Sequence, residues 1–556
     1  MTKLGEAVAA WIADDVDESC QAELRELMAR ATTDAAARGE LADRFRTRLQ
    51  FGTAGLRGVM AAGPNRMNRA VVIQAAKGLI DFLSHRVERP RVVIGNDARY
   101  HSREFALDTA AVITAAGGEA LLLPDRVPTP LTAYAVRHLG ADAGVMVTAS
   151  HNPAHDNGYK VYLGGRLVTD PERGVQIVPP YDAGIAALIA TAGPANQVPR
   201  ATGWTDCGDE VMESYLAAIA AGPRPAGPIR IVHTAMHGVG SAPARAALAR
   251  AGFDDVISVA AQQDPDPDFP TVAFPNPEEP GAIDRAVALA VEVAADVVIA
   301  NDPDADRCAV AVNDPRQGWR MLHGDELGAI LGEHVAQAGG DGVLVNSVVS
   351  SRQLERIAAD YGRPYVTTLT GFKWMGRVPG MAFAYEEAIG YCVRPDLVHD
   401  KDGLSTAVAV ARLTARLKSE GQGIMDLLDE LARRHGLYLS AQLAARFTDL
   451  AQIPRVMAGL HAHPLTTLAG AAVTGVVDLT TGWHGLPPTD GVLLTTDRGD
   501  RVVVRPSGTE PKVKCYLEVR EPVGTAASFE DLTQARAAAG TRLAAIKTDL
   551  NAALFG

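Results

Sequence analysis

Three aspartates alternate with other residues in the segment NDPDADR, at Asp302, Asp304 and Asp306. The segment follows the apolar run DVVIA, so the sequence predicts a loop at the end of a buried strand. Carboxylates at alternate positions of an irregular loop can converge on one small cation, and hard oxygen ligands of this kind suit Mg²⁺. The glycine and the glutamate of an EF-hand loop are missing, which argues against that calcium motif. A solvated acidic turn is the alternative.

A second polar segment, TASHNPAHDNGYK, follows the apolar run AGVMV and contains Ser150. The Ser150 hydroxyl is a candidate nucleophile, since His151 and Lys160 are available nearby to activate it. Pro153 and Gly158 indicate a rigid, tight loop. A serine that caps a turn is the alternative. The GxSxG pattern of hydrolases is absent around this serine, which weakens acyl transfer as its chemistry.

A third polar segment, RPSGTEPK, follows the strand-like run RVVV. It supplies a guanidinium, two hydroxyls, an ammonium and a glycine turn, from Arg505, Ser507, Gly508, Thr509 and Lys512. Such a set, with backbone amides pointing inward, predicts a phosphate-binding nest. The spacing of a Walker loop is missing, so nucleotide binding is not implied. A plain β-turn is the alternative.

Three further segments carry charged side chains in predicted loops. In YEEAIGY, Glu386 and Glu387 could accept hydrogen bonds from vicinal sugar hydroxyls, or could form a solvated acidic turn. In FGTAGLRG, Arg57 stands between glycines, which indicates a close approach of backbone and cation to an anion; an exposed loop arginine is the alternative. Lys373 and Lys401 also lie in predicted loops, and surface lysines are the alternative.

The elements that must position these groups follow a repeated pattern. Residues 91–150 alternate strand-like and helical runs as βαβαβ, which implies parallel strands, and the same rhythm returns at 229–302 and after Asp314. Residues 491–519 have the pattern of antiparallel strands with turns, followed by a helix from Phe529. The sequence therefore predicts three similar α/β modules with mainly parallel, mixed sheets and a C-terminal α+β domain. The polar segments fall where strands end, which is where open parallel sheets bind ligands.

Composition limits the function classes. The chain has 556 residues, enough for several domains, and a formal charge of −13 that repels polyanions. With 5% aromatic residues, nucleic-acid binding is disfavoured, and the longest apolar runs are too short to span a membrane. Five separated cysteines without CxxC spacing argue for a reducing compartment and against zinc. The first residues have no signal-peptide pattern, so we expect a cytoplasmic protein.

Taken together, these segments resemble the α-D-phosphohexomutase superfamily, in order from about Phe51 to Glu518. In that family TASHNP carries a phosphoserine, DPDADR is the magnesium loop, a GExSG-type loop contacts the sugar, and RPSGTEP binds the phosphate of the bound sugar. The resemblance implies four domains around one central cleft. The expected boundaries are 1–205 for the phosphoserine domain, 206–314 for the metal domain, 315–436 for the sugar domain and 437–556 for the C-terminal phosphate domain.

The resemblance also implies a role for each matching residue. It places the transferred phosphoryl group on Ser150 and Mg²⁺ on Asp302, Asp304, Asp306 and a phosphoserine oxygen, with Arg57, His151 and Lys160 near the transferring phosphate. The residues expected to line the sugar site are Arg307, Gly371, Lys373, Glu386 and Lys401. Those expected to hold the phosphate that does not react are Arg505, Ser507, Gly508, Thr509 and Lys514.

The activity implied is that of a phosphosugar mutase acting on sugar phosphates of glucose, mannose or both. It would interconvert hexose 1-phosphate and hexose 6-phosphate through the phosphoserine and a sugar bisphosphate intermediate, with a sugar 1,6-bisphosphate as activator. A monomer or a homodimer is expected. Ala388 stands where the hexomutase loop has serine, and the chain looks most like a branch of bacterial α-phosphoglucomutases and eukaryotic phosphopentomutase-like proteins, so ribose phosphate stays open. A metal-dependent sugar phosphatase and a non-catalytic phosphosugar-binding protein are the rival hypotheses.

Overall fold

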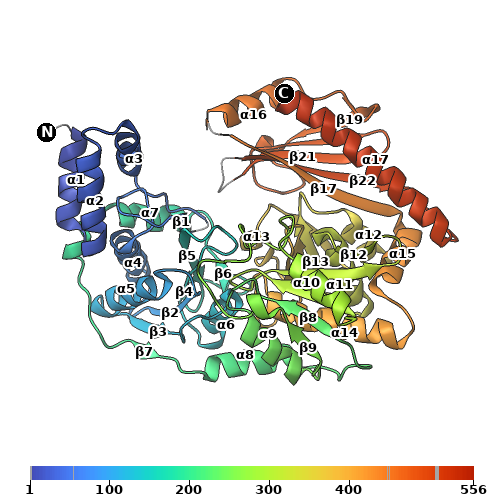
Figure 1. Cartoon of the computed structure of the whole chain (residues 1–556), viewed down its shortest axis with the longest axis horizontal. Coiled ribbons are helices and arrows are strands. Elements are labelled where there is room, and N and C mark those ends of the chain that lie inside the picture. The colour runs from blue at the N-terminus through green and yellow to red at the C-terminus, as the bar shows by residue number, and fades with distance from the viewer. Residues whose placement is uncertain (1–2, 54, 448, 450, 508–511, 556) are drawn as a thin grey trace. The chain divides into compact units, whose positions relative to one another are not determined.

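The computed structural model describes residues 3–53, 55–447, 449, 451–507 and 512–555 (Figure 1). Contacts along the chain separate two units, and each is described by itself. The first comprises Met1–Ala311, Phe372–Ala382 and Gly390–Arg416, and the second comprises Val312–Gly371, Phe383–Ile389 and Leu417–Gly556.

The first unit begins with three helices, which are α1 (Lys3–Asp14), α2 (Glu18–Arg30) and α3 (Ala35–Arg46). Asp17 and Asp34 start α2 and α3, since their carboxylates accept bonds from the amides of the first helical turn. The helices bury a small apolar core that includes Val8, Leu24 and Leu41. This bundle precedes the segments that carry the predicted site residues.

The first large sheet has the strand order β1-β5-β4-β2-β3-β7, with β6 paired to β5. Its strands are β1 (Leu56–Val59), β2 (Arg91–Asn96), β3 (Glu119–Leu122), β4 (Ala143–Val147), β5 (Asp156–Leu163), β6 (Val175–Gln176) and β7 (Thr205–Asp206). The helices of this part are α4 (Arg69–Ser84), α5 (Ser102–Ala115), α6 (Thr129–His138), α7 (Tyr181–Ala190) and α8 (Glu210–Ala220). Strands β2, β3 and β4 are parallel, as predicted, whereas β5 runs antiparallel to β4.

The second sheet contains β8 (Ile231–Thr234), β9 (Val256–Ser258), β10 (Val297–Asn301) and β11 (Cys308–Asp314), in the order β11-β10-β8-β9. Helices α9 (Ser241–Arg250) and α10 (Asp284–Glu292) connect its parallel strands. Strand β11 is antiparallel to β10, so a short loop, residues 302–307, joins the two. The remaining elements of the first unit are α13 (Phe372–Met375), β16 (Gly390–Cys392) and most of α14 (Gly403–Ser419).

The second unit has two sheets. Strands β13 (Val343–Ser347), β14 (Tyr365–Thr368) and β15 (Met381–Glu386) form the order β14-β13-β15, with β13 and β14 parallel. Nearby elements are β12 (Gly318–Met321), α11 (Gly324–Gln337), α12 (Gln353–Asp360) and α15 (Ile424–His435). A capping box at His323 starts α11, and the Gly423 amide donates to Asp426 Oδ2 at 2.7 Å at the start of α15.

The C-terminal sheet is antiparallel, in the order β17-β22-β21-β20-β19-β18. Its elements are β17 (Leu437–Arg446), α16 (Gln452–Ala462), β18 (Thr467–Leu468), β19 (Ala471–Asp478), β20 (Val492–Thr496), β21 (Arg501–Pro506), β22 (Lys512–Glu521) and α17 (Phe529–Leu554). Ser528 caps α17, which begins at Phe529 as predicted. The α/β modules and the antiparallel end confirm the predicted fold class. None of the helices in the described parts of the chain combines the length and the apolar character that a membrane crossing requires.

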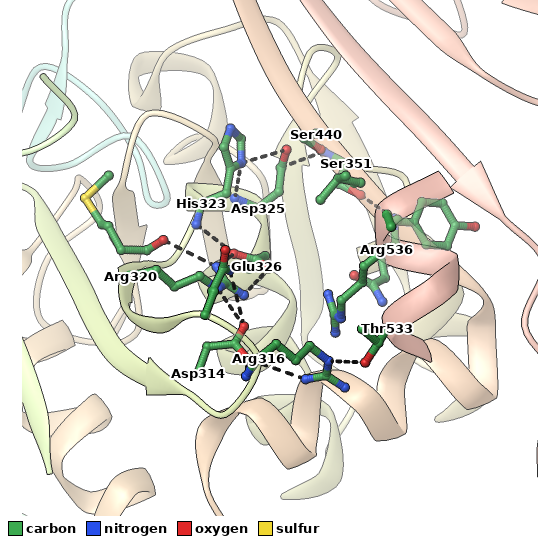
Figure 2. A pocket seen from close by; sticks show the side chains of 16 residues that line it. Asp314, Arg316, Arg320, His323, Asp325, Glu326, Ser351, Ser440, Thr533 and Arg536 are labelled. Carbon is green, nitrogen blue, oxygen red and sulfur yellow. Dashed lines mark hydrogen bonds and ion pairs between the residues drawn. The ribbon is translucent and has the colours of Figure 1, made fainter. Parts of the chain in front are cut away.

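A group of ion pairs in the second unit surrounds a cavity of about 530 Å³ (Figure 2). Arg320 binds Glu326 at 2.7 Å, and Arg316 donates to Thr533 of α17 at 2.9 Å. Asp429, on α15, is buried and accepts from Arg316 at 2.5 Å and from Arg536 of α17 at 2.9 Å. One carboxylate therefore joins three segments of the second unit.

We predict that Asp429→Ala lowers the free energy of unfolding of the second unit by about 3–5 kcal/mol, because it leaves Arg316 and Arg536 without their shared acceptor. Urea denaturation followed by circular dichroism measures the loss. Glu430→Gln is the matched control on the same helix, at an exposed position, and should change the free energy by less than about 0.5 kcal/mol. Equal stability of the two variants would contradict the role given to Asp429.

Candidate active site

Ser150 lies just beyond the end of β4, in a turn with left-handed backbone (φ 53°). Its amide donates to Thr148 Oγ1 at 2.9 Å, and only 3% of the residue is exposed. The Ser150 hydroxyl donates to Asp302 Oδ2 at 2.8 Å. His151 follows, with ring Nδ1 3.4 Å from the same hydroxyl oxygen. A carboxylate and an imidazole thus both reach the candidate nucleophile.

Arg99, which follows β2, holds this turn in place. Its Nη2 donates to the carbonyl oxygens of Ser150 at 2.7 Å and Asn152 at 2.6 Å, and its Nη1 donates to those of Pro153 at 2.7 Å and Asp156 at 3.1 Å. Burial lowers the pKa of the Arg99 guanidinium. Four carbonyls around one planar fork suit arginine, which presents five donors in fixed directions. Sequence reasoning missed Arg99, which lies three residues after the end of β2.

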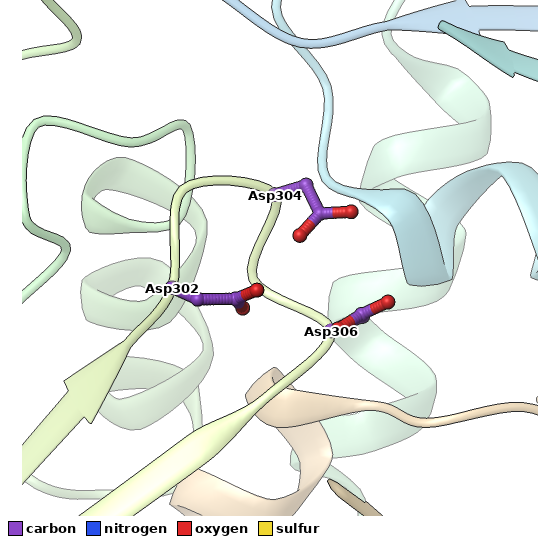
Figure 3. Close-up of side chains that lie close together, drawn as sticks. All are labelled: Asp302, Asp304 and Asp306. Atoms are coloured by element: carbon purple, nitrogen blue, oxygen red, sulfur yellow. The ribbon is translucent and has the colours of Figure 1, made fainter. Parts of the chain in front are cut away.

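Asp302, Asp304 and Asp306 lie on the loop between β10 and β11 and are 0%, 0% and 1% exposed (Figure 3). One carboxylate oxygen from each lies within 4.8 Å of the others. The Oδ1 atoms of Asp304 and Asp306 are buried and have no hydrogen-bond partner among the described residues. Buried carboxylate oxygens without donors are costly, and a cation that prefers oxygen ligands would satisfy them. The residues therefore fit the predicted Mg²⁺.

Neighbouring side chains fix the aspartate loop. Thr129, at the start of α6, donates from its amide to Asp304 O at 2.9 Å and from its hydroxyl to Asp304 Oδ2 at 2.7 Å. Asn301 donates to the carbonyl of Arg307 at 2.7 Å, and its Oδ1 lies 2.9 Å from His233 Nε2. Sequence reasoning missed Thr129 and Asn301. His233 supports the loop through Asn301.

Two lysines lie against the aspartate cluster. Lys160, on β5, donates from Nζ to Asp304 Oδ2 at 2.7 Å and to Asp306 Oδ2 at 2.9 Å, and Lys401 Nζ lies 3.4 Å from Asp306 Oδ2. Burial opposes ionisation of Asp304, but the Lys160 ammonium brings the pKa of Asp304 below its ordinary value. Burial, and then the charges of Asp304 and Asp306, raises the pKa of Asp302 well above its ordinary value. The lysines thus offset part of the negative charge of the cluster.

The other predicted residues of the first unit lie on β1, just before β11 and on α13. Arg57, on β1, donates from Nη1 to Asn152 Oδ1 at 3.2 Å, and burial lowers its pKa. Arg307 Nε lies 3.8 Å from the nearest oxygen of the aspartate cluster. Lys373, on α13, donates to Thr53 Oγ1 at 2.5 Å. Arg57 therefore contacts the Ser150 loop, and Arg307 contacts the aspartate loop.

The predicted sugar loop belongs to the second unit. Glu386 ends β15, and Glu387 follows it with 6% of its surface exposed. Glu387 Oε2 accepts from Ser347 Oγ at 3.2 Å and from Ser350 Oγ at 2.9 Å. Glu387 is therefore engaged within the second unit. Gly371, also of the second unit, has a positive φ of 105°.

The predicted phosphate-binding residues lie on β21 and β22. Arg505 and Lys514 are directly opposite each other in this antiparallel pair. Opposed like charges destabilise a strand pair, and an anion bound between them removes that cost. The Ser507 amide donates across the pair at 2.8 Å. Gly508 and Thr509 lie outside the described residues.

The structure thus brings one group of predicted residues together within the first unit. That group consists of Ser150, His151, Lys160, Asp302, Asp304, Asp306, Arg57, Arg307 and Lys401. The predicted residues that belong to the second unit are Gly371, Glu386, Arg505, Ser507 and Lys514. The arrangement in the first unit provides a nucleophile, a cation site and positive charge, which is the equipment of phosphoryl transfer.

The chain matches models of four consecutive protein domains. They are described as phosphoglucomutase/phosphomannomutase alpha/beta/alpha domain I at residues 48–192, domain II at 213–318, domain III at 323–435 and the C-terminal domain at 445–535. Together these matches cover most of the chain.

Individual proteins with names from this family are similar to the chain over most of its length. A probable phosphomannomutase of Haemophilus influenzae is 45% identical over 460 residues, which cover 82% of this chain and 93% of that protein. A phosphopentomutase of Mus musculus is 33% identical over 581 aligned positions, which cover 94% and 91%. The crystal structure of a phosphoglucomutase/phosphomannomutase family protein from Burkholderia thailandensis has a TM-score of 0.70 at 20% identity and covers 92% of this chain and 98% of that one, which shows a common fold.

We predict that Asp306→Asn weakens Mg²⁺ binding by about tenfold or more, because it removes one of the charged oxygens of the cluster. Isothermal titration calorimetry of the sugar-free protein measures the affinity. Asp254→Asn, at an exposed position of the same unit, is the matched control and should bind Mg²⁺ like the unchanged protein. If both variants bound equally well, the aspartate loop would not be the metal site.

Proposed function

We propose a specific reaction for this chain, which belongs to the phosphoglucomutase/phosphomannomutase family and is a phosphosugar mutase. It interconverts hexose 1-phosphates and hexose 6-phosphates, of glucose, mannose or both. The phosphoryl group is carried on Ser150. The supporting observation is the 2.8 Å hydrogen bond from Ser150 Oγ to Asp302, a member of the buried aspartate cluster. A nucleophile and a cation site in contact are what phosphoryl transfer requires.

The charge around Ser150 suits a phosphoryl group in transit. Such a group spreads negative charge over its oxygens, so it is stabilised mainly by cations and aligned donors. Mg²⁺ held by Asp302, Asp304, Asp306 and a phosphoserine oxygen would supply charge neutralisation there. Arg57, which contacts the Ser150 loop, adds a guanidinium from the protein.

The reaction exchanges one phosphoester bond for another. Phosphorylated Ser150 transfers its phosphoryl group to the unreacted hydroxyl of a hexose monophosphate, so the Oγ–P bond breaks as the sugar O–P bond forms. The bisphosphate produced turns over and returns the phosphoryl group from its other end. A sugar 1,6-bisphosphate acts as activator because it restores the phosphoserine whenever that group has been lost.

Proton transfer falls to His151 and Lys160. When Ser150 takes the phosphoryl group back, its hydroxyl proton must leave, and His151 Nδ1 lies 3.4 Å from that oxygen. Burial would lower the pKa of Lys160, but Asp304 and Asp306 raise it above its ordinary value. Lys160 is therefore an ammonium that can donate a proton to a sugar oxygen. We assign acceptance of the proton to His151 and its donation to Lys160.

Residues of the second unit bind the part of the substrate that does not react. Arg505 and Lys514, opposed on β21 and β22, would hold the second phosphate together with Ser507, Gly508 and Thr509. Glu386 would accept hydrogen bonds from sugar hydroxyls. The remaining sugar contacts are assigned to Arg307, Gly371, Lys373 and Lys401.

The choice of a hexose is supported by the relative of 45% identity, which is named a probable phosphomannomutase. Phosphopentomutase is the second candidate, since several relatives at 32% to 35% identity are named phosphopentomutases or phosphoribomutases. The loop after β15 also has Ala388 in place of the serine of the hexomutase pattern. One hydroxyl fewer in this loop favours a change of sugar specificity.

We also propose the four-domain division at 1–205, 206–314, 315–436 and 437–556. The boundaries after 205 and 436 fall between matched domain ranges, and the boundary after 314 falls where β11 ends. A cytoplasmic location is supported by the five cysteines, none of which forms a disulfide. A monomer or a homodimer is the expected assembly.

We predict that, with Mg²⁺ and catalytic sugar bisphosphate, kcat/KM for glucose 1-phosphate or mannose 1-phosphate exceeds that for ribose 1-phosphate by about a thousandfold, or about 4 kcal/mol. Coupled assays measure each rate. Ser150→Ala should abolish turnover of all three substrates, whereas Ser214→Ala should retain it. A preference for ribose would identify a phosphopentomutase, and release of inorganic phosphate in step with turnover would identify a phosphatase.

We predict that Arg99→Lys lowers kcat about 100-fold with little change in KM, because one ammonium cannot replace the bonds to four carbonyls that position Ser150. Steady-state kinetics on glucose 1-phosphate measure both constants. Arg103→Lys, in which a nearby arginine with a carbonyl partner is replaced, is the matched control and should keep its kcat. An unchanged kcat in Arg99→Lys would show that the turn does not depend on this guanidinium.

A further inference from the structure

A second cavity, of about 360 Å³, lies in the first unit beside the start of α9. Met212 and Leu216 of α8 and Pro243 of α9 give it apolar walls, and Arg126 lines it from the loop between β3 and α6. The volume is that of a pocket for a small organic ligand. None of these residues belongs to the mutase site assigned above.

Hydrogen-bond donors at the start of α9 lack acceptors. The amides of Gly240, Ser241 and Ala242 make no hydrogen bond to any described residue, and no side chain caps the helix. Ser241 is 4% exposed, lines the cavity, and its hydroxyl has no hydrogen-bond partner within the described part of the chain. Unpaired amides at a helix N-terminus favour an anion, and a hydroxyl without a partner in the protein can donate to the same anion.

Two arginines add positive charge to the cavity. Arg245 lies one turn after Ser241 on the same helical face and has no ion-pair partner among the residues that the structure describes. Arg126 pairs at 3.6 Å with Asp125, which does not itself line the cavity. Asp264 also lines the cavity and opposes them, so two guanidinium groups face one lining carboxylate. Guanidinium groups beside a helix N-terminus suit a phosphate, and the apolar walls suit an organic group attached to it.

Both walls of the cavity are bonded to the aspartate loop. On the α9 side, the Val239 amide donates to Pro303 O at 2.8 Å. A Cβ at Gly238 would lie 2.3 Å from Pro303 Cα, so the two backbones are in direct contact. On the other side, Arg126 precedes Thr129, whose amide and hydroxyl both donate to Asp304. A ligand that joins the two walls would therefore restrain the loop that carries the aspartate cluster.

We propose that this cavity is a regulatory site for a small organic phosphate. The phosphate group binds the first turn of α9, at the Ser241 hydroxyl and between Arg245 and Arg126, and the organic part lies against Met212 and Leu216. Occupancy changes the affinity of the aspartate loop for Mg²⁺. The site does not depend on the sugar that the mutase prefers.

Calorimetric titration of the metal-free, sugar-free protein with phenyl phosphate tests the binding. Arg245→Gln should weaken it about tenfold, as expected for the loss of one charged hydrogen bond. Arg250→Gln, on the same helix but outside the cavity lining, is the matched control and should bind normally. Arg505→Gln separates this site from the mutase site. Binding that is lost in Arg505→Gln but kept in Arg245→Gln would overturn the proposal.

Two further measurements test the nature of the ligand and its effect. Inorganic phosphate should bind more weakly than phenyl phosphate, and equal binding would overturn the organic part of the assignment. Saturating phenyl phosphate should change the Mg²⁺ dissociation constant of the unchanged protein by about fivefold or more, a coupling of ordinary size for linked sites. Arg245→Gln should need about tenfold more phenyl phosphate for the same change. Binding of phenyl phosphate with no change in the Mg²⁺ constant would overturn the regulatory role.

Discussion

The buried carboxylates of Asp302, Asp304 and Asp306 repel one another, and the surrounding residues of the first unit must offset this repulsion. One oxygen of each carboxylate lies within 4.8 Å of the others, so each pair of charges costs at least about 3 kcal/mol at the effective dielectric of a protein surface. Lys160 and Lys401 offset part of this cost, and Thr129 holds Asp304 by two hydrogen bonds. The Lys160 ammonium that neutralises the loop is also the group to which we assign proton donation. In the proposed mechanism, stability of the loop and catalysis therefore use the same charge.

The position of these charges follows from the direction of the strands. Parallel strands β2 and β4 deliver Arg99 and Ser150 at their carboxyl ends, and β10, parallel to β8 in the next sheet, delivers Asp302. Backbone groups are unpaired where such strands end, and loops there can vary without disturbing the sheet. The Ser150 turn shows how such a loop is made rigid, because a single guanidinium binds four of its carbonyls.

Much of this arrangement could be predicted from the sequence, because apolar runs such as AGVMV and DVVIA mark strands that are buried on both faces, and the polar segments directly after them mark the loops. The antiparallel direction of β5 and β11 could not, since a buried strand has the same pattern in either direction. Strand β17, at 437–446, was not among the predicted strands, because its half-exposed residues follow no regular alternation. Sequence alone also could not tell that Glu387 is bound by Ser347 and Ser350 while Glu386 ends a strand. Arg99 was missed because its partners are backbone carbonyls, which leave no mark in a sequence.

The left-handed backbone of Ser150 restricts which amino acid could carry the phosphoryl group in the proposed mechanism. Threonine offers the same hydroxyl chemistry, but its branched Cβ is strained at positive φ. Cysteine would keep the shape and change the reactivity of the atom beside Asp302. The backbone therefore favours an unbranched side chain at this position before any question of nucleophilicity arises, so steric constraint as well as chemistry limits which residue could serve as the proposed carrier.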